Sequence, residues 1–309
     1  MNVAQNLVNS ARTCPDKKAI RFEGAEITYR ELDIQCNHLA NALRDLGLAP
    51  GDHCLVMMPN SIEIVIVYFA LAKMGVVQMT VNPLERFSTL AYIVSEAKPK
   101  AFIGAEPHLD EIRRVFKSVD GPAIRLATGV SANSEFIDLT MAYSARPEYP
   151  LFHPDSGDVV NVFYSGKSPG VVRKVQLTHT TIFTHTKAIA DAWEEEEHET
   201  VVIVALPLYR MFGIVSVLNA SVYRGLTIEL LARFDPERVV EMIARRRQTL
   251  LFVCSAMIGP LIEAAGRRHI QNSLKYCVSE GKALPDKMVQ RFNELFGVRI
   301  VERCGGETL

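Results

Sequence analysis

A regular alternation of helix-like and strand-like segments runs through most of the chain, and it constrains the fold more than any other feature. The first clear helix begins at the capping box Thr28-Tyr29-Arg30-Glu31, whose Thr and Glu side chains bind two otherwise unpaired backbone amides. Apolar residues then recur at helical spacing as far as Leu46, and Gly47 and Pro50 follow as stop signals. This segment predicts an amphipathic helix that buries one face.

Segments of both kinds then follow one another to the end of the chain. The expected strands are 54–58, 76–81, 100–104, 123–127, 159–164, 171–177, 200–205, 226–231, 249–253, 274–279 and 299–302. The expected helices are 61–73, 88–97, 108–117, 179–193, 212–222, 236–246, 256–265 and 285–296. Strands as continuously apolar as 76–81 are buried on both faces by crossover helices, so we expect an α/β fold with doubly wound sheets. The irregular, proline-containing stretch 128–157 predicts a connection between a first subdomain, 1–157, and a second, 158–309.

Composition excludes several classes of protein. The 309 residues carry a net charge of -1 and contain no dense Lys/Arg cluster, so nucleic acid is not an expected partner. The six cysteines are scattered without CxxC pairs, which favours a reducing cytoplasm over a disulfide framework or a metal site. The longest apolar runs, 64–72 and 201–209, are about half the ~20 residues needed to cross a bilayer. We therefore expect no transmembrane segment, and peripheral membrane contact stays open.

The segment 161–179 carries the strongest chemical signal, because a strand leads into a loop of small and basic residues. Backbone amides at glycines, hydroxyl donors and cationic side chains together can hold phosphate. The residues concerned are Ser165, Gly166, Lys167, Ser168, Gly170, Arg173 and Lys174. The alternative interpretation is a polar hairpin with exposed basic residues. A Walker A loop is not indicated, since Asn161 stands where that motif needs Gly and Pro169 follows the Ser.

Five segments in order resemble the adenylate-forming, or AMP-binding, superfamily in its acyl-CoA synthetase (fatty-acid–CoA ligase) branch. Segment 165–179, ending in Val-Gln-Leu-Thr-His, resembles the family's AMP-binding signature. The others are Gly-Val-Val-Gln-Met-Thr-Val-Asn-Pro at 75–83, Leu-Pro-Leu-Tyr-Arg-Met-Phe-Gly at 206–213, Ser-Glu-Gly-Lys-Ala-Leu-Pro at 279–285 and Val-Glu-Arg-Cys-Gly-Gly-Glu-Thr at 301–308. Pro59-Asn60 and the residues around Thr28 also resemble the family, so the similarity spans nearly the whole chain.

The resemblance implies two doubly wound subdomains of the family's large domain, truncated before the C-terminal lid. It also implies a cytoplasmic acid–thiol ligase that uses ATP and Mg²⁺ to form an acyl-adenylate and then transfers the acyl group to coenzyme A. Fatty acids are slightly favoured over aromatic acids as the small-molecule substrate.

By position, the resemblance also assigns site residues. Catalytic roles fall to Glu307, Thr308 and Arg173, with Glu307 as the metal ligand. Nucleotide binding falls to Ser165, Gly166, Lys167, Ser168, Gly170, Lys174, Gly281, Lys282, Ala283, Cys304 and Gly305, and the substrate pocket to Tyr209, Arg210, Phe212 and Gly213. Other interpretations stay open: Tyr209 and Phe212 as core aromatics, the glycines at 305–306 as a plain turn, and His179 as a helix-start residue without ligand contact.

Several positions depart from the family pattern. Arg173 replaces the loop's usual Lys and Lys174 its final Gly, which restricts the backbone there. Arg210 stands where many relatives have His, Ala283 replaces a Pro, and Cys304 replaces an aromatic residue.

By resemblance, the ribose-binding Asp, the hinge and the lid with its catalytic Lys would lie beyond residue 309. We therefore expect the chain alone to be weak or inactive and of marginal stability. A degenerate module that binds nucleotide or acyl-CoA is the main alternative, and an α/β protein that only assembles with partners is a third.

Overall fold

The structure is a computed structural model, and it describes residues 1–106, 108–168, 171–193, 200–245, 249–266 and 274–304. The α-helices are α1 (Gln5–Thr13), α2 (Tyr29–Asp45), α3 (Ile62–Met74), α4 (Phe87–Ala97), α5 (Asp110–Ser118), α6 (His179–Ala192), α7 (Asn219–Tyr223), α8 (Pro236–Arg245), α9 (Ser255–Gly266) and α10 (Asp286–Phe296), and a π-helix, η1 (Phe212–Leu218), precedes α7. The strands are β1 (Lys18–Phe22), β2 (Ala25–Thr28), β3 (His53–Met57), β4 (Val77–Thr80), β5 (Ala101–Ala105), β6 (Ile124–Thr128), β7 (Ile137–Asp138), β8 (Val159–Ser168), β9 (Val171–Thr178), β10 (Val201–Val204), β11 (Thr227–Leu230), β12 (Thr249–Cys254), β13 (Leu274–Gly281) and β14 (Ile300–Cys304).

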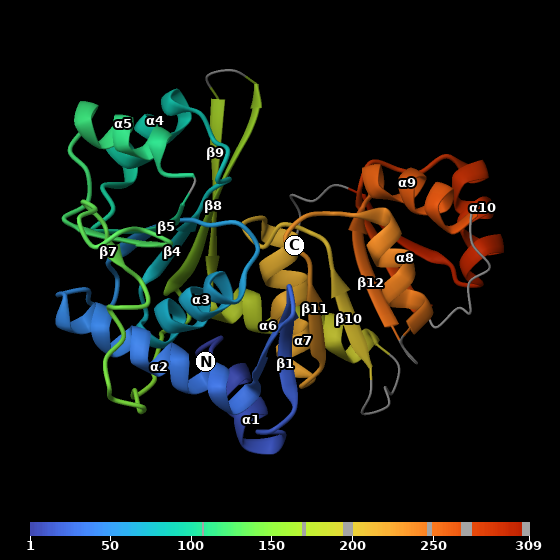
Figure 1. The fold of residues 1–309 in the computed structure, drawn as a ribbon, viewed down its shortest axis with the longest axis horizontal. Helices are drawn as coiled ribbons and strands as arrows, with labels where there is room; N and C mark the ends of the chain where they lie inside the picture. Colours follow the sequence, from blue (N-terminus) through green and yellow to red (C-terminus); the bar gives the residue numbers. More distant parts are fainter. Residues whose placement is uncertain (107, 169–170, 194–199, 246–248, 267–273, 305–309) are drawn as a thin grey trace.

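These strands form two sheets of seven strands each. The first sheet has the order β7-β6-β5-β3-β4-β8-β9 and the second the order β14-β13-β12-β10-β11-β1-β2. Pairing is parallel except between β8 and β9 and between β1 and β2, which are antiparallel. Figure 1 shows the sheets side by side with helices between and around them. The predicted α/β fold with doubly wound sheets is confirmed.

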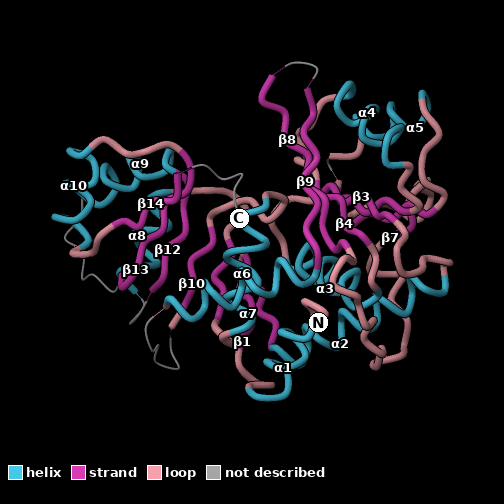
Figure 2. Tube along the Cα trace, turned by 180° about the vertical axis from the view of Figure 1, so that it is seen from behind, coloured by secondary structure: helices cyan, strands magenta, loops and turns pink. Residues whose placement is uncertain are grey.

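Three apolar clusters show how the layers pack. One cluster lies between the two sheets and joins α1, α2, α3, α6 and η1 to the inner faces of both. A second packs α8, α9 and α10 on the outer face of the β10–β14 sheet, and a third packs α4 and α5 on the outer face of the β3–β8 sheet. The molecule therefore has five layers, helix, sheet, helix, sheet, helix, which can be followed from behind in Figure 2.

Each sheet contains strands from both sides of the expected boundary at residue 157. The hairpin β8–β9 completes the first sheet. In the second sheet β1 pairs with β11, with Ile20 opposite Ile228, and β2 pairs with β1. Sheet membership thus does not divide at 157, and the division into subdomains 1–157 and 158–309 stays a prediction.

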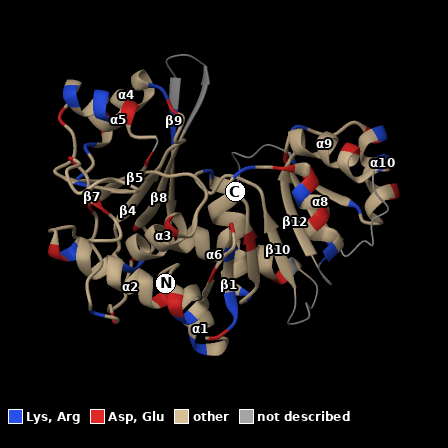
Figure 3. Ribbon diagram, in the orientation of Figure 1, with Lys and Arg blue, Asp and Glu red and all other residues tan. Residues whose placement is uncertain are grey.

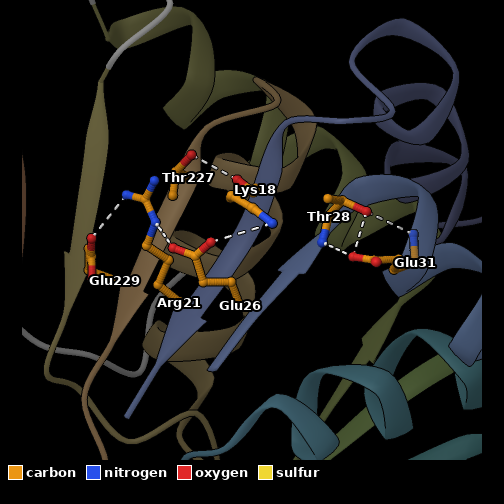
Figure 4. A network of polar contacts seen from close by, with 7 residues as sticks. All are labelled: Lys18, Arg21, Glu26, Thr28, Glu31, Thr227 and Glu229. Carbon is orange, nitrogen blue, oxygen red and sulfur yellow. Dashed lines mark hydrogen bonds and ion pairs between the residues drawn. The ribbon is translucent and has the colours of Figure 1, made fainter. Parts of the chain in front are cut away.

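Ion pairs and hydrogen bonds attach the β1–β2 hairpin to the second sheet (Figure 4). Arg21 contacts Glu26 at 2.8 Å and Glu229 of β11 at 3.2 Å, and the Thr227 hydroxyl donates to the Lys18 carbonyl oxygen at 2.7 Å. Beside them, the predicted capping box at the start of α2 is present, because the Thr28 and Glu31 side chains each accept the other's backbone N–H. These contacts tie the start of the chain to strands about two hundred residues later.

A buried network fixes the connection before β8. Lys73, on α3 and only 1% exposed, lies 2.7 Å from the Asp33 carboxylate and 2.6 Å from the Asn37 side-chain oxygen on α2. The Asn37 amide nitrogen in turn donates to the Pro147 carbonyl oxygen, and Asn41 donates to that of Glu148. The stretch predicted as a linker is therefore held against α2 and α3.

Charged side chains of both signs are spread over the outer helices (Figure 3). Among the described helices, none is both long and apolar enough to cross a membrane.

Candidate active site at the carboxyl edge of the second sheet

The order of strands locates the site. In the second sheet, β10 lies between β11 and β12, so successive connections leave it in opposite directions. Ligands of open α/β sheets bind at the carboxyl ends of the strands beside such a reversal. The segment 205–211 follows β10 and the turn 281–285 ends β13, and both belong to this edge of the sheet. The predicted pocket and adenine residues are thus brought to one edge.

Asn60 holds the loop after β10 in place. Its buried side chain donates to the carbonyl oxygens of Leu206 and Leu231, each at 2.9 Å, and accepts from the Leu208 amide at 2.8 Å. Asn60 itself follows β3 of the other sheet, so it couples the two sheets at the site. The sequence showed it only as part of Pro59-Asn60 and gave no sign of this role.

The pocket residues differ in their surroundings. Phe212 is buried with its ring 6.3 Å from that of Phe252, which supports the core interpretation of this residue. A Cβ atom on Gly213 would lie 2.5 Å from the Pro207 carbonyl oxygen, so close packing of η1 on the loop requires glycine there. Tyr209 is half-buried and Arg210 is exposed. Pocket roles for these four residues stay predictions.

The turn after β13 presents its backbone to solvent. Gly281 has a φ of +123°, which favours glycine, and a Cβ there would lie 2.9 Å from the Ser255 hydroxyl oxygen. That hydroxyl accepts from the Lys282 amide at 3.3 Å, while the Leu284 amide donates to Glu302 at 2.8 Å. Gly281, Lys282 and Ala283 are exposed. An open backbone turn of this kind suits a flat base, and its nucleotide role stays a prediction.

The segment expected to form a phosphate loop is largely an antiparallel hairpin. Strand β8 continues through Ser168 where the sequence predicted a loop from 165, and the register sets Ser165 opposite Arg173 and Gly166 opposite Val172. Ladder pairing takes up part of the backbone that a phosphate loop would leave open, so the expected length of the loop was wrong. Lys167 also has strand backbone, and Gly170 lies outside the described residues.

Lys174 already has an anionic partner. Its ammonium lies 3.1 Å from Glu96 of α4, and the Tyr164 hydroxyl donates to the same carboxylate at 3.0 Å. Burial would raise the pKa of Glu96, but the hydrogen bonds from Lys174 and Tyr164 lower it below its usual value. Arg173 is exposed on the same strand. Phosphate would have to compete with Glu96 for Lys174.

Charged and titratable residues that no sequence motif indicates also lie at this edge. Glu280 lies opposite Arg303 in the β13–β14 register. Partial burial raises the pKa of Glu280, and the positive charges of Arg210 and Arg303 oppose that rise. His185 of α6 lies 3.1 Å from the Ser216 hydroxyl, and burial followed by the charge of Arg303 lowers its pKa. The only signal in the sequence was a Glu inside a glycine-containing turn.

His179 has a structural contact. It is fully buried, and its Nδ1 accepts a hydrogen bond from the Val3 amide at 3.2 Å. Burial, and then the charge of the N-terminus, lower its pKa to about 4 although Asp158 acts in the other direction. This supports the interpretation of His179 as a helix-start residue without ligand contact.

Comparison with known proteins decides the family. The family model of the AMP-binding enzyme matches residues 7–308. The chain belongs to the AMP-binding enzyme family. The predicted membership in the adenylate-forming superfamily is confirmed.

This AMP-binding chain is similar to ligases of different acids. It is 27% identical over 330 residues to a long-chain-fatty-acid–CoA ligase of Bacillus subtilis strain 168, covering 97% of this chain and 58% of the relative. It is 26% identical over 284 residues to 4-coumarate-CoA ligase 1 of Narcissus pseudonarcissus, covering 87% and 51%. The crystal structure of the N-terminal domain of FACL13 from Mycobacterium tuberculosis matches with a TM-score of 0.87 at 20% identity, covering 99% of this chain and 76% of that one. The chain thus spans little more than half of these curated relatives.

Within this family member, the predicted metal site cannot be placed. Glu307, Thr308 and Gly305 lie outside the described residues, and Cys304 contributes only the last backbone position of β14. In the part of the chain that the structure describes, no group of three or more His, Cys, Asp or Glu side chains is arranged to hold a metal. The metal role of Glu307 therefore stays a prediction.

Proposed function

We propose that this chain forms the acid- and nucleotide-binding part of an ATP-dependent carboxylic acid–CoA ligase that works through an acyl-adenylate. The observation that carries the proposal is the family match over residues 7–308, together with the loop 206–213 and the turn 281–285 at one sheet edge. The carboxyl edge beside a strand reversal is where such folds bind ligands.

Each residue set has a role in this proposal. The exposed backbone at 281–283 lies along the adenine, and the loop 206–213 borders the acyl group. Arg173 and Lys174 stabilise negative charge on the departing pyrophosphate, which requires Lys174 to leave Glu96. Glu307 would hold Mg²⁺ with Thr308 near the α-phosphate, since a hard cation prefers carboxylate oxygen. Bound Mg²⁺ would neutralise phosphate charge, and coenzyme A would supply the thiol that accepts the acyl group.

The acid itself is a finer question. The sequence slightly favoured a fatty acid, whereas the curated relatives include ligases named for fatty and for coumaric acid. The family thus leaves the acid open.

A degenerate binding module is the second candidate. The observation that favours it is the Lys174–Glu96 pair on a hairpin whose ladder extends into the expected phosphate loop. In this case nucleotide or acyl-CoA would bind without turnover.

Two measurements on the 309-residue chain separate the candidates: titration calorimetry with MgATP and with acyl-CoA, and acid-dependent ATP–pyrophosphate exchange. A ligase part gives heat with MgATP and slow exchange that depends on an added acid. Heat without exchange for any fatty, aryl or dicarboxylic acid favours the binding module. No heat with either MgATP or acyl-CoA would remove both candidates.

A matched pair of glycine variants tests whether the turn is the nucleotide site. Gly281→Ala should abolish the MgATP heat, because its new methyl group meets the Ser255 hydroxyl at this turn. Gly24→Ala is the control, since Gly24 also has a positive φ of +86° but has open space around it in the β1–β2 hairpin. Equal MgATP affinity in the two variants would place the nucleotide elsewhere.

A further inference from the structure

The inner face of the second sheet changes from apolar to charged at its carboxyl edge. Val204, Phe252 and Val278 lie side by side in register and belong to the cluster between the two sheets. Side chains two positions along a strand share a face, so Glu280 continues the face of Val278. Arg303 is in register with Glu280 and therefore points to the same side.

The middle helical layer faces this charged end of the sheet. Phe212, at the start of η1, packs its ring against Phe252. Arg210 lies two residues earlier, where its amide donates to the Pro207 carbonyl oxygen at 3.2 Å. The positive charge of Arg210, from the loop before η1, and that of Arg303, from the neighbouring strand, both oppose the rise in the pKa of Glu280. An apolar, aromatic base thus ends in a charged rim at the proposed acyl site.

Among the residues that the structure describes, this rim carries more positive than negative charge. Neither Arg210 nor Arg303 has an ion-pair partner among the residues that the structure describes, and both are exposed. Glu280 is the nearby carboxylate, half-buried, and it offsets one of the two guanidinium charges. His185 does not add a cation at neutral pH, because its pKa is lowered. Of the described side chains at this rim, one positive charge is left for a ligand.

A simple alkyl chain fits this rim badly. It would strip water from two guanidinium groups and a carboxylate without replacing their hydrogen bonds, and such desolvation is costly. A carboxylate suits it well, because guanidinium groups bind carboxylates in paired, charge-assisted hydrogen bonds.

We propose that Arg210 and Arg303 form a subsite for a second carboxylate, so that the acid substrate is a dicarboxylic acid and not a simple fatty acid. The proposal rests on the proposed function in one respect, that the acid binds beside the loop 206–213. In this arrangement the reacting carboxylate faces the nucleotide turn, the distal carboxylate contacts the two arginines, and the carbon chain lies between them along the rim, beside the buried apolar base.

The test compares two acids that differ only in the distal group. Titration calorimetry of the 309-residue chain with adipate and with hexanoate should show adipate binding about tenfold more tightly, the order expected for one charge-assisted contact at a partly exposed site. Arg210→Gln and Arg303→Gln should each reduce that preference, and the double variant should abolish it. Glu280→Gln should strengthen adipate binding, because it removes the competing negative charge.

Lys275→Gln is the matched control, since Lys275 is an exposed cation at the opposite end of β13. It should leave the adipate preference unchanged. Equal or tighter binding of hexanoate, no binding of either acid, or an adipate preference that survives the double arginine variant would each overturn the subsite.

The same acids in ATP–pyrophosphate exchange separate this proposal from the proposed function. If the chain binds adipate more tightly than hexanoate but catalyses no ATP–pyrophosphate exchange, the carboxylate subsite is supported and the ligase function is contradicted. Exchange that is faster with hexanoate than with adipate would keep the ligase and remove the subsite.

Discussion

Two groups of charged residues in this molecule obey opposite rules. Lys73 is 1% exposed, and its ammonium contacts both the Asp33 carboxylate and the Asn37 amide oxygen. Arg210 and Arg303 are exposed at the carboxyl edge of the second sheet and have no ion-pair partner among the described residues. A buried charge must be paired within the protein, whereas an exposed one remains stable in water. The first group therefore holds the fold together, and the second is available to a ligand.

The largest effect expected from this contrast is on stability. Lys73→Met removes the cation and leaves Asp33 and Asn37 without their partner, so we expect a loss of about 3 kcal/mol in the free energy of unfolding. Urea unfolding measures it. Lys117→Met, at an exposed position in α5, is the control and should change stability by less than about 0.5 kcal/mol. If Arg210→Gln destabilises the chain as much as Lys73→Met does, the contrast between the two groups fails.

A second effect concerns pH. The folded pKa of His179 is about 4, below its ordinary value of 6.5, because burial disfavours the charged ring and the positive charge of the N-terminus repels it. As the pH falls, the His179 ring takes up a proton in the unfolded chain at a higher pH than in the folded protein. The contribution of the neutral ring to stability is therefore complete above about pH 6.5 and is lost as the pH falls toward 4. The full loss in the free energy of unfolding is about 3 kcal/mol.

Unfolding curves at pH 7, 6, 5 and 4 test this for the wild type and His179→Gln. The wild type should lose stability more steeply than the variant over this window. Parallel pH profiles would mean that His179 titrates normally in the folded protein. His153→Gln, in the connection before β8, controls for the removal of a histidine from an exposed site.

The smallest effect concerns the hairpin. Glu96→Gln breaks a partly exposed ion pair with Lys174, so stability should change by less than about 1 kcal/mol. If Lys174 contributes to phosphate binding, its release should tighten MgATP binding measured by calorimetry. Glu111→Gln, which breaks an exposed pair with Arg114 on α5, is the control. Weaker MgATP binding in Glu96→Gln would show that the Glu96 contact positions Lys174 for the nucleotide.

Most of the middle of the fold was predictable, because local patterns carry it. Helix α3 was expected at 61–73 and spans Ile62–Met74, and β12 was expected at 249–253 and spans Thr249–Cys254. The start of the chain was not predicted, since β1 is stabilised by pairing with β11 about two hundred residues away. The segment 212–222 was expected as one helix, but its first part is the π-helix η1. The side chain of Asn219, the first residue of α7, donates to the Ile214 carbonyl oxygen within η1.

The candidate site was predictable only where a motif named it. Resemblance assigned Gly281 to the nucleotide and Arg210 to the acid; the structure brings both to one edge of the second sheet, and their roles stay predictions. The sequence did not indicate the contacts of Asn60 or the position of Arg303 beside Glu280, because they depend on pairing between separate strands and loops that no local pattern records. The hairpin end at Ser168 was missed for a similar reason, since antiparallel pairing overrides the weak strand preference of Gly and Ser.

The carboxyl edge of the second sheet is the proposed binding site of both the nucleotide and the acid. A crystal structure of the chain with MgATP and adipate tests it most directly. We expect the adenine along the backbone of 281–283 and a carboxylate of adipate between Arg210 and Arg303. Nucleotide bound away from this edge, or adipate absent from the two arginines while ATP is in place, would contradict it.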